Sequence, residues 1–339
     1  QRKSRSSIPR HVATQFNIMI KLTVNGTDIT KVVLDNLISI TVTDERDGDV
    51  DQLHIEIANP NLEIALPAPK AKLNLWLQDD AGELVDMGIY HVDTSELSGP
   101  DLRINITARS ADITDSLRVR REVSYKDTTL GDMLKQIASR NALDAVIGIT
   151  LGAIAIDHFD QAGESDLSVI ERLGKLYDAV AAVKAGRLLF KEAGTGKTAS
   201  GKSLDPVMLE LTGSENWRLR LEATSYTGVT GFWNDKFGAK RKEVSVGTDV
   251  NPLNIGGTFR SEWQCKNAVD ARWKQLQRAQ SFFSITLPSL NPYAVPDAPL
   301  QFSTNWPQEI KSQDLIITRI VHRINDGKHT SIEAELKTS

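Results

Sequence analysis

The run Gly194-Thr195-Gly196-Lys197-Thr198 is the part of the sequence closest to a phosphate-binding loop. In such a loop the lysine reaches the phosphates, the threonine binds Mg²⁺, and a further glycine precedes the Gly-Lys pair by five positions. Lys191 stands at that position, and the residues after Thr198 do not favour a helix whose N-terminus would bind phosphate. We therefore interpret residues 194–206 as a linker or long loop and not as a nucleotide site.

The histidines show no i, i+3 or i, i+4 spacing and no accompanying cysteine cluster. They are His11, His54, His91, His158, His322 and His329. Because metal sites need convergent donors, the sequence predicts no metal. His322 and His329 could meet across the last hairpin, and we interpret such a contact as one between paired surface residues and not as a metal site.

Carboxylates at nearly alternating positions could be the ligands of a Ca²⁺-binding loop. The members of this run are Asp44, Glu45, Asp47, Asp49 and Asp51. The spacing of a calcium-binding helix-loop-helix is absent, since the glycine is misplaced and no glutamate stands at the twelfth position. We interpret the run as a solvated acidic loop that protects a strand edge from aggregation.

Candidates for covalent or acid–base catalysis are equally sparse. Cys265 is the one cysteine and has no neighbouring histidine in the sequence, and no Gly-x-Ser-x-Gly motif occurs. A single cysteine also excludes an intramolecular disulfide framework and favours folding in a reducing cytoplasm. The sequence thus predicts no catalytic residues, no cofactor-binding residues and no enzymatic activity.

Tryptophans concentrate in the last third of the chain, where they suggest either a stacking surface for glycan or nucleic acid, or anchors of a core or subunit interface. They are Trp217, Trp233, Trp263, Trp273 and Trp306. We prefer the second interpretation, because Trp273 belongs to an apolar helical stripe. A nearby basic cluster is interpreted as a solvated hairpin face. It contains Lys236, Lys240, Arg241 and Lys242.

The bulk properties are those of an ordinary globular protein with two or three domains. The chain has 339 residues, 40% hydrophobic and 25% charged, with a formal net charge of −4. This charge argues against tight, sequence-independent binding to nucleic acid. No apolar stretch approaches the roughly 18 residues of a membrane-spanning helix, and the basic start, residues 1–16, lacks the apolar segment of a signal peptide. We expect that start to be a flexible tail.

Residues 17–112 are predicted to form an antiparallel sheet or barrel. Apolar residues alternate in the pattern of half-buried strands over 17–24, 53–57, 73–77 and 102–106. Asn25-Gly26 and the run 79–82 supply turns between these strands. This is the first of three predicted domains.

Residues 113–200 are predicted to form a smaller α+β module with a terminal linker. Two helices are expected, the first over 130–138 behind a Thr129/Asp132 capping box and the second from a Ser165 cap to Tyr177. A small hairpin over 179–190, with its turn at Gly186, completes the module.

Residues 201–339 return to strands and contain one helix. Strands are predicted at 208–211 and 217–221, a long hairpin at 225–246, and a terminal hairpin over 315–336 with its turn at 325–327. Val269, Trp273, Leu276 and Phe283 are assigned to one face of the helix. The fold class is therefore α+β, mainly β.

Five segments in their order along the chain resemble the phage late control D family, the central hub of contractile-tail baseplates. They are ISITVTDERDGDVDQLHIEIANP at 38–60, LVDMGIYHVDTSELSGPDLRINITARSAD at 84–112, KDTTLGDMLKQIASRNAL at 126–143, DQAGESDLSVIERLGKLYDA at 160–179 and LIITRIVHRINDGKHTSIEAELK at 315–337. The sequence is also similar to the trunk of VgrG proteins and to the hub of T-even phages.

The resemblance implies a homotrimer in which 17–112 and 201–339 are tube-like antiparallel β-barrel domains flanking the α+β module. Three copies would form a pseudo-sixfold ring between the hexameric tail tube and a separate trimeric central spike. Tape measure and baseplate wedge proteins are further implied partners, with DNA only as cargo passing through the lumen. The implied location is the virion tail baseplate, assembled in the bacterial host cytoplasm.

Two alternatives remain open from the sequence. One is the hub of an R-type pyocin, other tailocin or related contractile injection system, which the sequence does not separate from a phage hub. The other is a glycan-binding or hydrolytic baseplate component, which would need an aromatic platform or paired carboxylates in a groove.

Overall fold

The computed structural model describes residues 20–46, 51–110, 115–184, 186–223, 225–235, 238 and 240–338. Strands dominate this described part, and the fold is α+β and mainly β, which confirms the predicted class. The predicted tail 1–16 and the start of the first predicted strand lie outside the described residues. No helix among the described residues is long and apolar enough to cross a membrane.

The first β-rich segment is an antiparallel sheet with one short helix. Its elements are β1 (Ile20–Val24), β2 (Thr27–Asp28), α1 (Thr30–Asn36), β3 (Leu37–Glu45), β4 (Gln52–Ala58), β5 (Lys72–Gln78), β6 (Leu84–Ser98) and β7 (Arg103–Arg109). Leu53, Ile55 and Ile57 alternate into the core as predicted. Asn25 and Gly26 adopt the positive φ values of 49° and 85° that the predicted turn requires.

The middle segment packs helices against short strands. Its elements are α2 (Asp115–Arg118), β8 (Arg120–Thr129), α3 (Leu130–Arg140), β9 (Asp144–Ile147), α4 (Ile149–Gly152), β10 (Ala155–Ser165), α5 (Asp166–Tyr177), β11 (Ala179–Lys184) and β12 (Arg187–Glu192). Both predicted helix starts are confirmed, since Thr129 accepts a hydrogen bond from Asp132 N and Ser165 from Ser168 N, each at 3.1 Å. The predicted β11–β12 hairpin is also present.

The last segment contains both predicted hairpins. Its elements are β13 (Val207–Leu209), β14 (Asn216–Leu221), β15 (Gly228–Asp235), β16 (Lys240–Gly247), β17 (Pro252–Asn254), α6 (Glu262–Arg278), β18 (Ser281–Leu287), β19 (Leu300–Phe302), α7 (Gln308–Lys311), β20 (Leu315–Ile324) and β21 (Lys328–Leu336). The assignment of Phe283 to the helix was wrong. The chain leaves α6 after Arg278, and Phe283 is buried on β18 beside Trp306.

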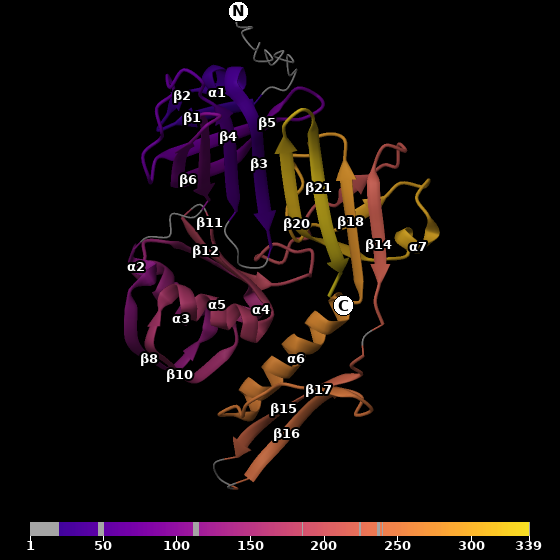
Figure 1. The fold of residues 1–339 in the computed structure, drawn as a ribbon. Coiled ribbons are helices and arrows are strands. Elements are labelled where there is room, and N and C mark those ends of the chain that lie inside the picture. The colour runs from indigo at the N-terminus through magenta and orange to yellow at the C-terminus, as the bar shows by residue number, and fades with distance from the viewer. Residues whose placement is uncertain are drawn as a thin grey trace, which may run out of the picture.

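One 11-stranded sheet joins the two β-rich segments, in the order β14-β18-β21-β20-β3-β4-β7-β6-β5-β1-β2 (Figure 1). The join is the antiparallel pair β20–β3, whose register runs from Arg319↔Glu45 to Ile324↔Ile40. The middle segment lies below the first part of this sheet in Figure 1. Residues 228–278, which hold β15, β16, β17 and α6, project beyond the sheet and are called the arm below.

The buried apolar side chains form four separate clusters. The first fills the sheet of residues 20–108 and also contains Leu290 and Ile324. The second fills the middle segment, and the third the β18–β20–β21 part of the sheet. The fourth belongs to the arm and has only Val229, Cys265 and Val269 as fully buried members. Each part therefore has its own core, and the core of the arm is the smallest.

The Gly-rich segment 194–206 is a packed loop between β12 and β13. Thr198 N donates to Lys202 O and Leu204 N to Gly196 O, both at 2.8 Å. Beneath the loop, Lys191 Nζ lies 2.5 Å from Asp297 Oδ2 and donates to Lys197 O at 2.6 Å. The side chains of this pair are only 9% and 1% exposed, so the ion pair is buried.

The terminal hairpin places the two C-terminal histidines apart. Its register pairs His322 with Thr330 and Arg323 with His329, so the two rings lie on opposite faces and do not meet. The interpretation of both as surface residues was wrong for His322, which is 2% exposed. His322 is buried, with Nδ1 3.0 Å from Thr330 Oγ1, and burial lowers its pKa from 6.5 to about 4. His322 also faces Val42 across the β20–β3 join.

Replacing Lys191 by methionine should lower the free energy of unfolding by about 3–5 kcal/mol, because Asp297 would remain as an uncompensated buried charge. Chemical denaturation followed by circular dichroism measures the change. Lys31→Met is the matched control. It removes one partner of the exposed Lys31–Asp35 pair and should cost at most about 1 kcal/mol. Equal losses in the two variants would contradict a special role for the buried pair.

Acid should destabilise the protein partly through His322. The unfolded chain binds a proton at this ring below about pH 6.5, whereas the folded chain binds it only near pH 4. The contribution of neutral His322 to the free energy of unfolding is therefore complete above pH 6.5. It is lost as the pH falls towards 4, by roughly 3 kcal/mol in total. Urea denaturation of the wild type and of His322→Gln at several pH values isolates this contribution. The same acid dependence in both proteins would refute it.

Candidate functional site

The motif that suggested nucleotide binding lacks the helix that such a site needs. Lys197 and Thr198 lie in the packed loop, and Lys197 bridges to Ser203 where a phosphate-binding helix would begin. Gly194 has a φ of 70°, and a Cβ there would come within 2.7 Å of Arg278 Cδ and Thr338 Oγ1. Close packing therefore accounts for this glycine.

The remaining chemical candidates do not converge. Over the part of the chain that the structure describes, no group of three or more His, Cys, Asp or Glu side chains is placed to hold a metal. Cys265 lies in the first turn of α6 and is fully buried, where desolvation and the nearby charge of Glu262 raise its pKa. A raised thiol pKa is the reverse of what an activated nucleophile requires.

The aromatic side chains are anchors of the cores. Trp306 is 2% exposed and packs against the rings of Phe283, Phe302 and Trp217, and its Nε1 donates to Leu209 O at 3.0 Å. Trp233 and Trp273 pack into the core of the arm. This arrangement confirms the interpretation as core anchors for Trp306, Trp233 and Trp273, whereas Trp217 and Trp263 are each 37% exposed.

The basic hairpin face is exposed, as predicted, at Lys240, Arg241 and Lys242, whereas Lys236 lies outside the described residues. Arg241 covers the Phe232 ring at 3.8 Å, and Lys242 Nζ lies 2.7 Å from Asp235 Oδ2.

Part of the acidic run is not a solvated loop. Lys184, at the end of β11, donates to Asp44 Oδ1 at 2.8 Å and to Asp51 Oδ1 at 2.6 Å. Burial, and next the hydrogen bond with Asp51, raise the pKa of Asp44 to about 7. Asp47 and Asp49 lie outside the described residues. For Asp44 and Asp51 the prediction of a solvated loop was wrong. Both carboxylates bind the ammonium of Lys184, at least 133 residues later in the chain, in a contact between the sheet and the middle segment.

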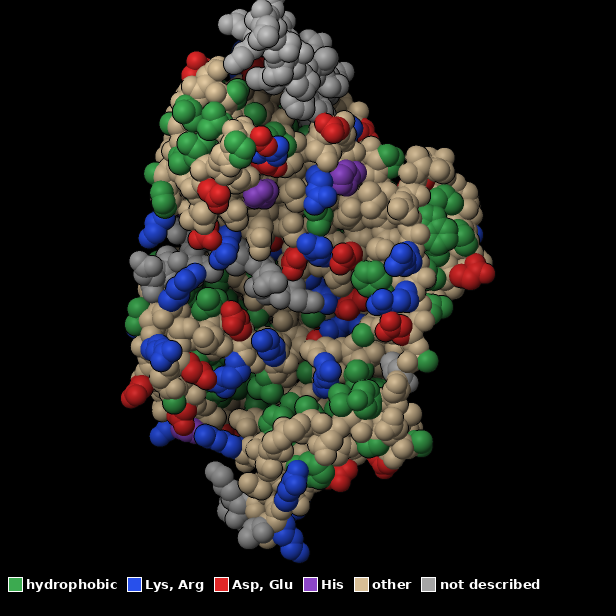
Figure 2. Space-filling model, in the orientation of Figure 1, with side chains coloured by type: hydrophobic (Ala, Val, Ile, Leu, Met, Phe, Trp, Pro, Cys, Tyr) green, Lys and Arg blue, Asp and Glu red, His purple; other side chains and the backbone are tan. Residues whose placement is uncertain are grey.

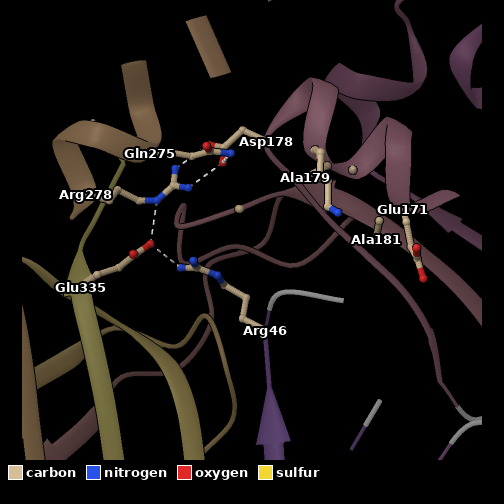
Figure 3. Close-up of a pocket in the computed structure, with 11 residues that line it drawn as sticks. Arg46, Glu171, Asp178, Ala179, Ala181, Gln275, Arg278 and Glu335 are labelled. Atoms are coloured by element: carbon tan, nitrogen blue, oxygen red, sulfur yellow. Dashed lines mark hydrogen bonds and ion pairs between the residues drawn. The ribbon is translucent and has the colours of Figure 1, made fainter. Parts of the chain in front are cut away.

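A second charged contact joins four parts of the molecule at the end of α6 (Figure 3). The Arg278 guanidinium, 4% exposed, donates to both carboxylate oxygens of Asp178, at 2.5 and 2.6 Å, and to Glu335 Oε1 at 2.7 Å. Glu335 Oε1 also lies 2.8 Å from Nη1 of Arg46. The row Arg46–Glu335–Arg278–Asp178, called the charged junction below, thus connects the end of β3 with β21, α6 and the α5–β11 corner.

Electrostatics favour the charged form of Arg278. Burial lowers the pKa of Arg278, but the hydrogen bond to Asp178 and the charges of Asp178 and Glu335 outweigh it and raise that pKa. Asp178 caps the C-terminus of α5 with a φ of 52°, a left-handed conformation that aspartate tolerates. The arrangement can fix orientations, and it offers no nucleophile or base to a substrate.

The 11-stranded sheet ends differently on its two sides. On one side the sheet ends in the two-residue strand β2, and α1 covers the rest of β1, since Leu22 N donates to Thr30 Oγ1 of α1 at 2.9 Å. At the other side, no described strand pairs with the outer edge of β14. Trp217 there stacks on Trp306 with ring centroids 5.6 Å apart, whereas Leu221 on the same face is 61% exposed. Hydrophobic side chains gather on this side of the molecule, near β14 and α7 (Figure 2).

Sequence reasoning missed the charged junction and the open edge. The four residues of the junction are far apart along the chain, and no local pattern marks them as partners. The one available signal was Asp178 directly after an amphipathic helix, at a position where a left-handed cap is common. The β14 strand itself was predicted, but its place at the end of the sheet depends on long-range pairing.

No family model matches the chain. It is similar to the probable baseplate hub protein of Escherichia phage 186, with 34% identity over 362 aligned positions that cover 94% of this chain and 92% of that protein. It is also similar to the probable baseplate hub protein of Escherichia phage P2, with 32% identity and coverage of 94% and 93%.

Solved structures share the fold. The 43 kDa tail protein of prophage MuSo2 from Shewanella oneidensis has a TM-score of 0.68 at 15% identity, covering 94% of this chain and 98% of that one. A type VI secretion component of E. coli has a TM-score of 0.57 at 13% identity, covering 94% and 77%. The sequence relatives and the shared architecture together confirm the resemblance seen in the ordered segments. The chain belongs to the family of phage baseplate hub proteins.

Proposed function

We propose that the chain is a structural, non-enzymatic hub of a contractile-tail baseplate and that three copies close into a pseudo-sixfold ring. In this proposal residues 17–112 and 201–339 are the two tube-like domains of each subunit. The ring joins a hexameric tail tube to a trimeric central spike, with tape measure and wedge proteins as further neighbours. Assembly takes place in the host cytoplasm, and DNA passes through the lumen of the finished virion.

The open edge of β14 is the observation that carries the ring. An unpaired strand edge presents backbone donors and acceptors to another chain, and natural proteins usually protect such edges with lysine or a covering element. The outer edge of β16 in the arm carries Lys240, Arg241 and Lys242, and the β1 edge is covered by α1. β14 has no covering element among the described residues. One of its faces carries the exposed Arg218 and Arg220, whereas the row that begins at Trp217 on the other face ends in the exposed Leu221.

Lateral contact through a sheet edge also suits a ring. A contact between two different surfaces of identical chains repeats around an axis and closes when the rotation allows. The two β-rich segments share one sheet, so each copy would bring an edge of one segment to the neighbouring copy. This geometry supports six similar positions from three chains.

Replacing Leu221 by lysine should convert the proposed trimer to monomer at micromolar concentration, because a lysine on the open edge opposes pairing and leaves a charge in an apolar contact. Mass photometry and negative-stain imaging of the purified protein measure this change. We expect rings for the wild type and at least a tenfold weaker association for the variant, about 1.4 kcal/mol or more.

Ser245→Lys is the matched control, since it adds the same charge to the already basic β16 edge. It should leave the trimer unchanged. A wild-type protein that remains monomeric would refute the ring, whereas a wild-type trimer that Leu221→Lys does not weaken would refute the β14 edge as its contact surface.

A further inference from the structure

The arm is held to the rest of the protein by few apolar contacts. Its own core contains three fully buried side chains, and no cluster of buried apolar residues spans the arm and another part of the described chain. Val250, in the loop between β16 and β17, is 85% exposed. A unit with so little buried apolar surface sits at the low end of the local stability range.

Two cavities flank α6 where the arm meets the middle segment. One, of about 450 Å³, is lined by Glu171, Lys175, Gln275 and the charged junction (Figure 3). The other, of about 710 Å³, lies between α6, α4 and the Gly-rich loop. Both are open to solvent, so α6 does not pack closely against the middle segment along its whole length.

Polar contacts with Asp178 take the place of packing. Gln275 Nε2 and the Arg278 guanidinium lie one helical turn apart on α6, and both donate to the Asp178 carboxylate. At the N-terminal end of α6, Trp263 packs on Tyr177 with ring centroids 5.9 Å apart, but Trp263 remains 37% exposed. Among these contacts, the Arg278–Asp178 ion pair is buried and has the most hydrogen bonds.

We propose that the arm unfolds locally while the 11-stranded sheet stays folded, and that the Arg278–Asp178 ion pair is the latch that holds the arm in its closed, folded state. Breaking the latch releases the C-terminal end of α6 from the α5–β11 corner. The small core of the arm then loses the support of the neighbouring segment, and α6 separates from β15. The inference goes beyond the proposed ring, because it concerns the movement of one part within each chain.

Cys265 is a built-in reporter of this opening. It is the single cysteine of the sequence, is fully buried, and lies where α6 meets β15, so close that a Cβ on Gly231 would come within 2.9 Å of its sulfur. A thiol reagent reaches this sulfur only when the arm opens. The labelling rate under native conditions therefore measures the population of the open arm.

The test is labelling of Cys265 by Ellman's reagent in the full chain at 25 °C. In Asp178→Asn and Arg278→Lys we expect labelling at least tenfold faster than in the wild type, which corresponds to about 1.4 kcal/mol of lost latch stability. Arg319→Lys is the matched control, because it makes the same change in the Arg319–Glu45 pair at the β20–β3 join. The control should label at the wild-type rate within twofold.

A measurement on the wild type alone keeps the proposal testable if a variant fails to fold. Labelling in increasing urea should show a shallower urea dependence than global unfolding followed by circular dichroism, since a local opening exposes less surface. The proposal is overturned if labelling has the same urea dependence as global unfolding, if latch variants label at the wild-type rate, or if Arg319→Lys accelerates labelling as much as they do. Ring formation is scored separately by mass photometry.

Discussion

The pairing of β20 with β3 decides the architecture of this protein. It joins strands about 280 residues apart in the sequence, and through it two β-rich segments become one continuous sheet. Such long-range pairing costs loop-closure entropy. The burial of a row of side chains on both sides of the join offsets that cost. Val42, His322 and Thr330 lie buried in that row. The middle segment and the arm are then placed relative to a single rigid sheet.

Charged contacts set those placements. Lys184 ties the middle segment to the sheet through Asp44 and Asp51, Lys191 ties the Gly-rich loop to Asp297, and Arg278 ties the arm to the α5–β11 corner. Buried ion pairs add little net stability compared with apolar packing, but they are directional and penalise any arrangement that leaves one charge alone. A hub that must present surfaces at fixed angles to several neighbours benefits from contacts of this kind.

Local features of the fold were predictable from the sequence because their causes are local. The alternation at Leu53, Ile55 and Ile57 identified a strand. Thr129 and Ser165 marked the starts of two helices, because each side chain accepts a hydrogen bond from a backbone N–H only three residues later. The ordered segments also identified the family. What the sequence did not predict depends on partners distant in the chain. Phe283 continued the spacing of α6 but belongs to the next strand, and the acidic residues Asp44 and Asp51 found their counter-charge on β11.

Gly194 illustrates how one residue type serves unrelated ends. Its left-handed backbone and the lack of a side chain allow Arg278 and the C-terminal Thr338 to approach the loop from two directions. The first glycine of the Gly-Thr-Gly-Lys-Thr run is thus accounted for by close packing where three chain segments meet. Genome searches that identify nucleotide-binding proteins by short glycine–lysine patterns will also match packed loops of this kind. A helix directly after the pattern distinguishes a phosphate-binding loop from such a packed loop.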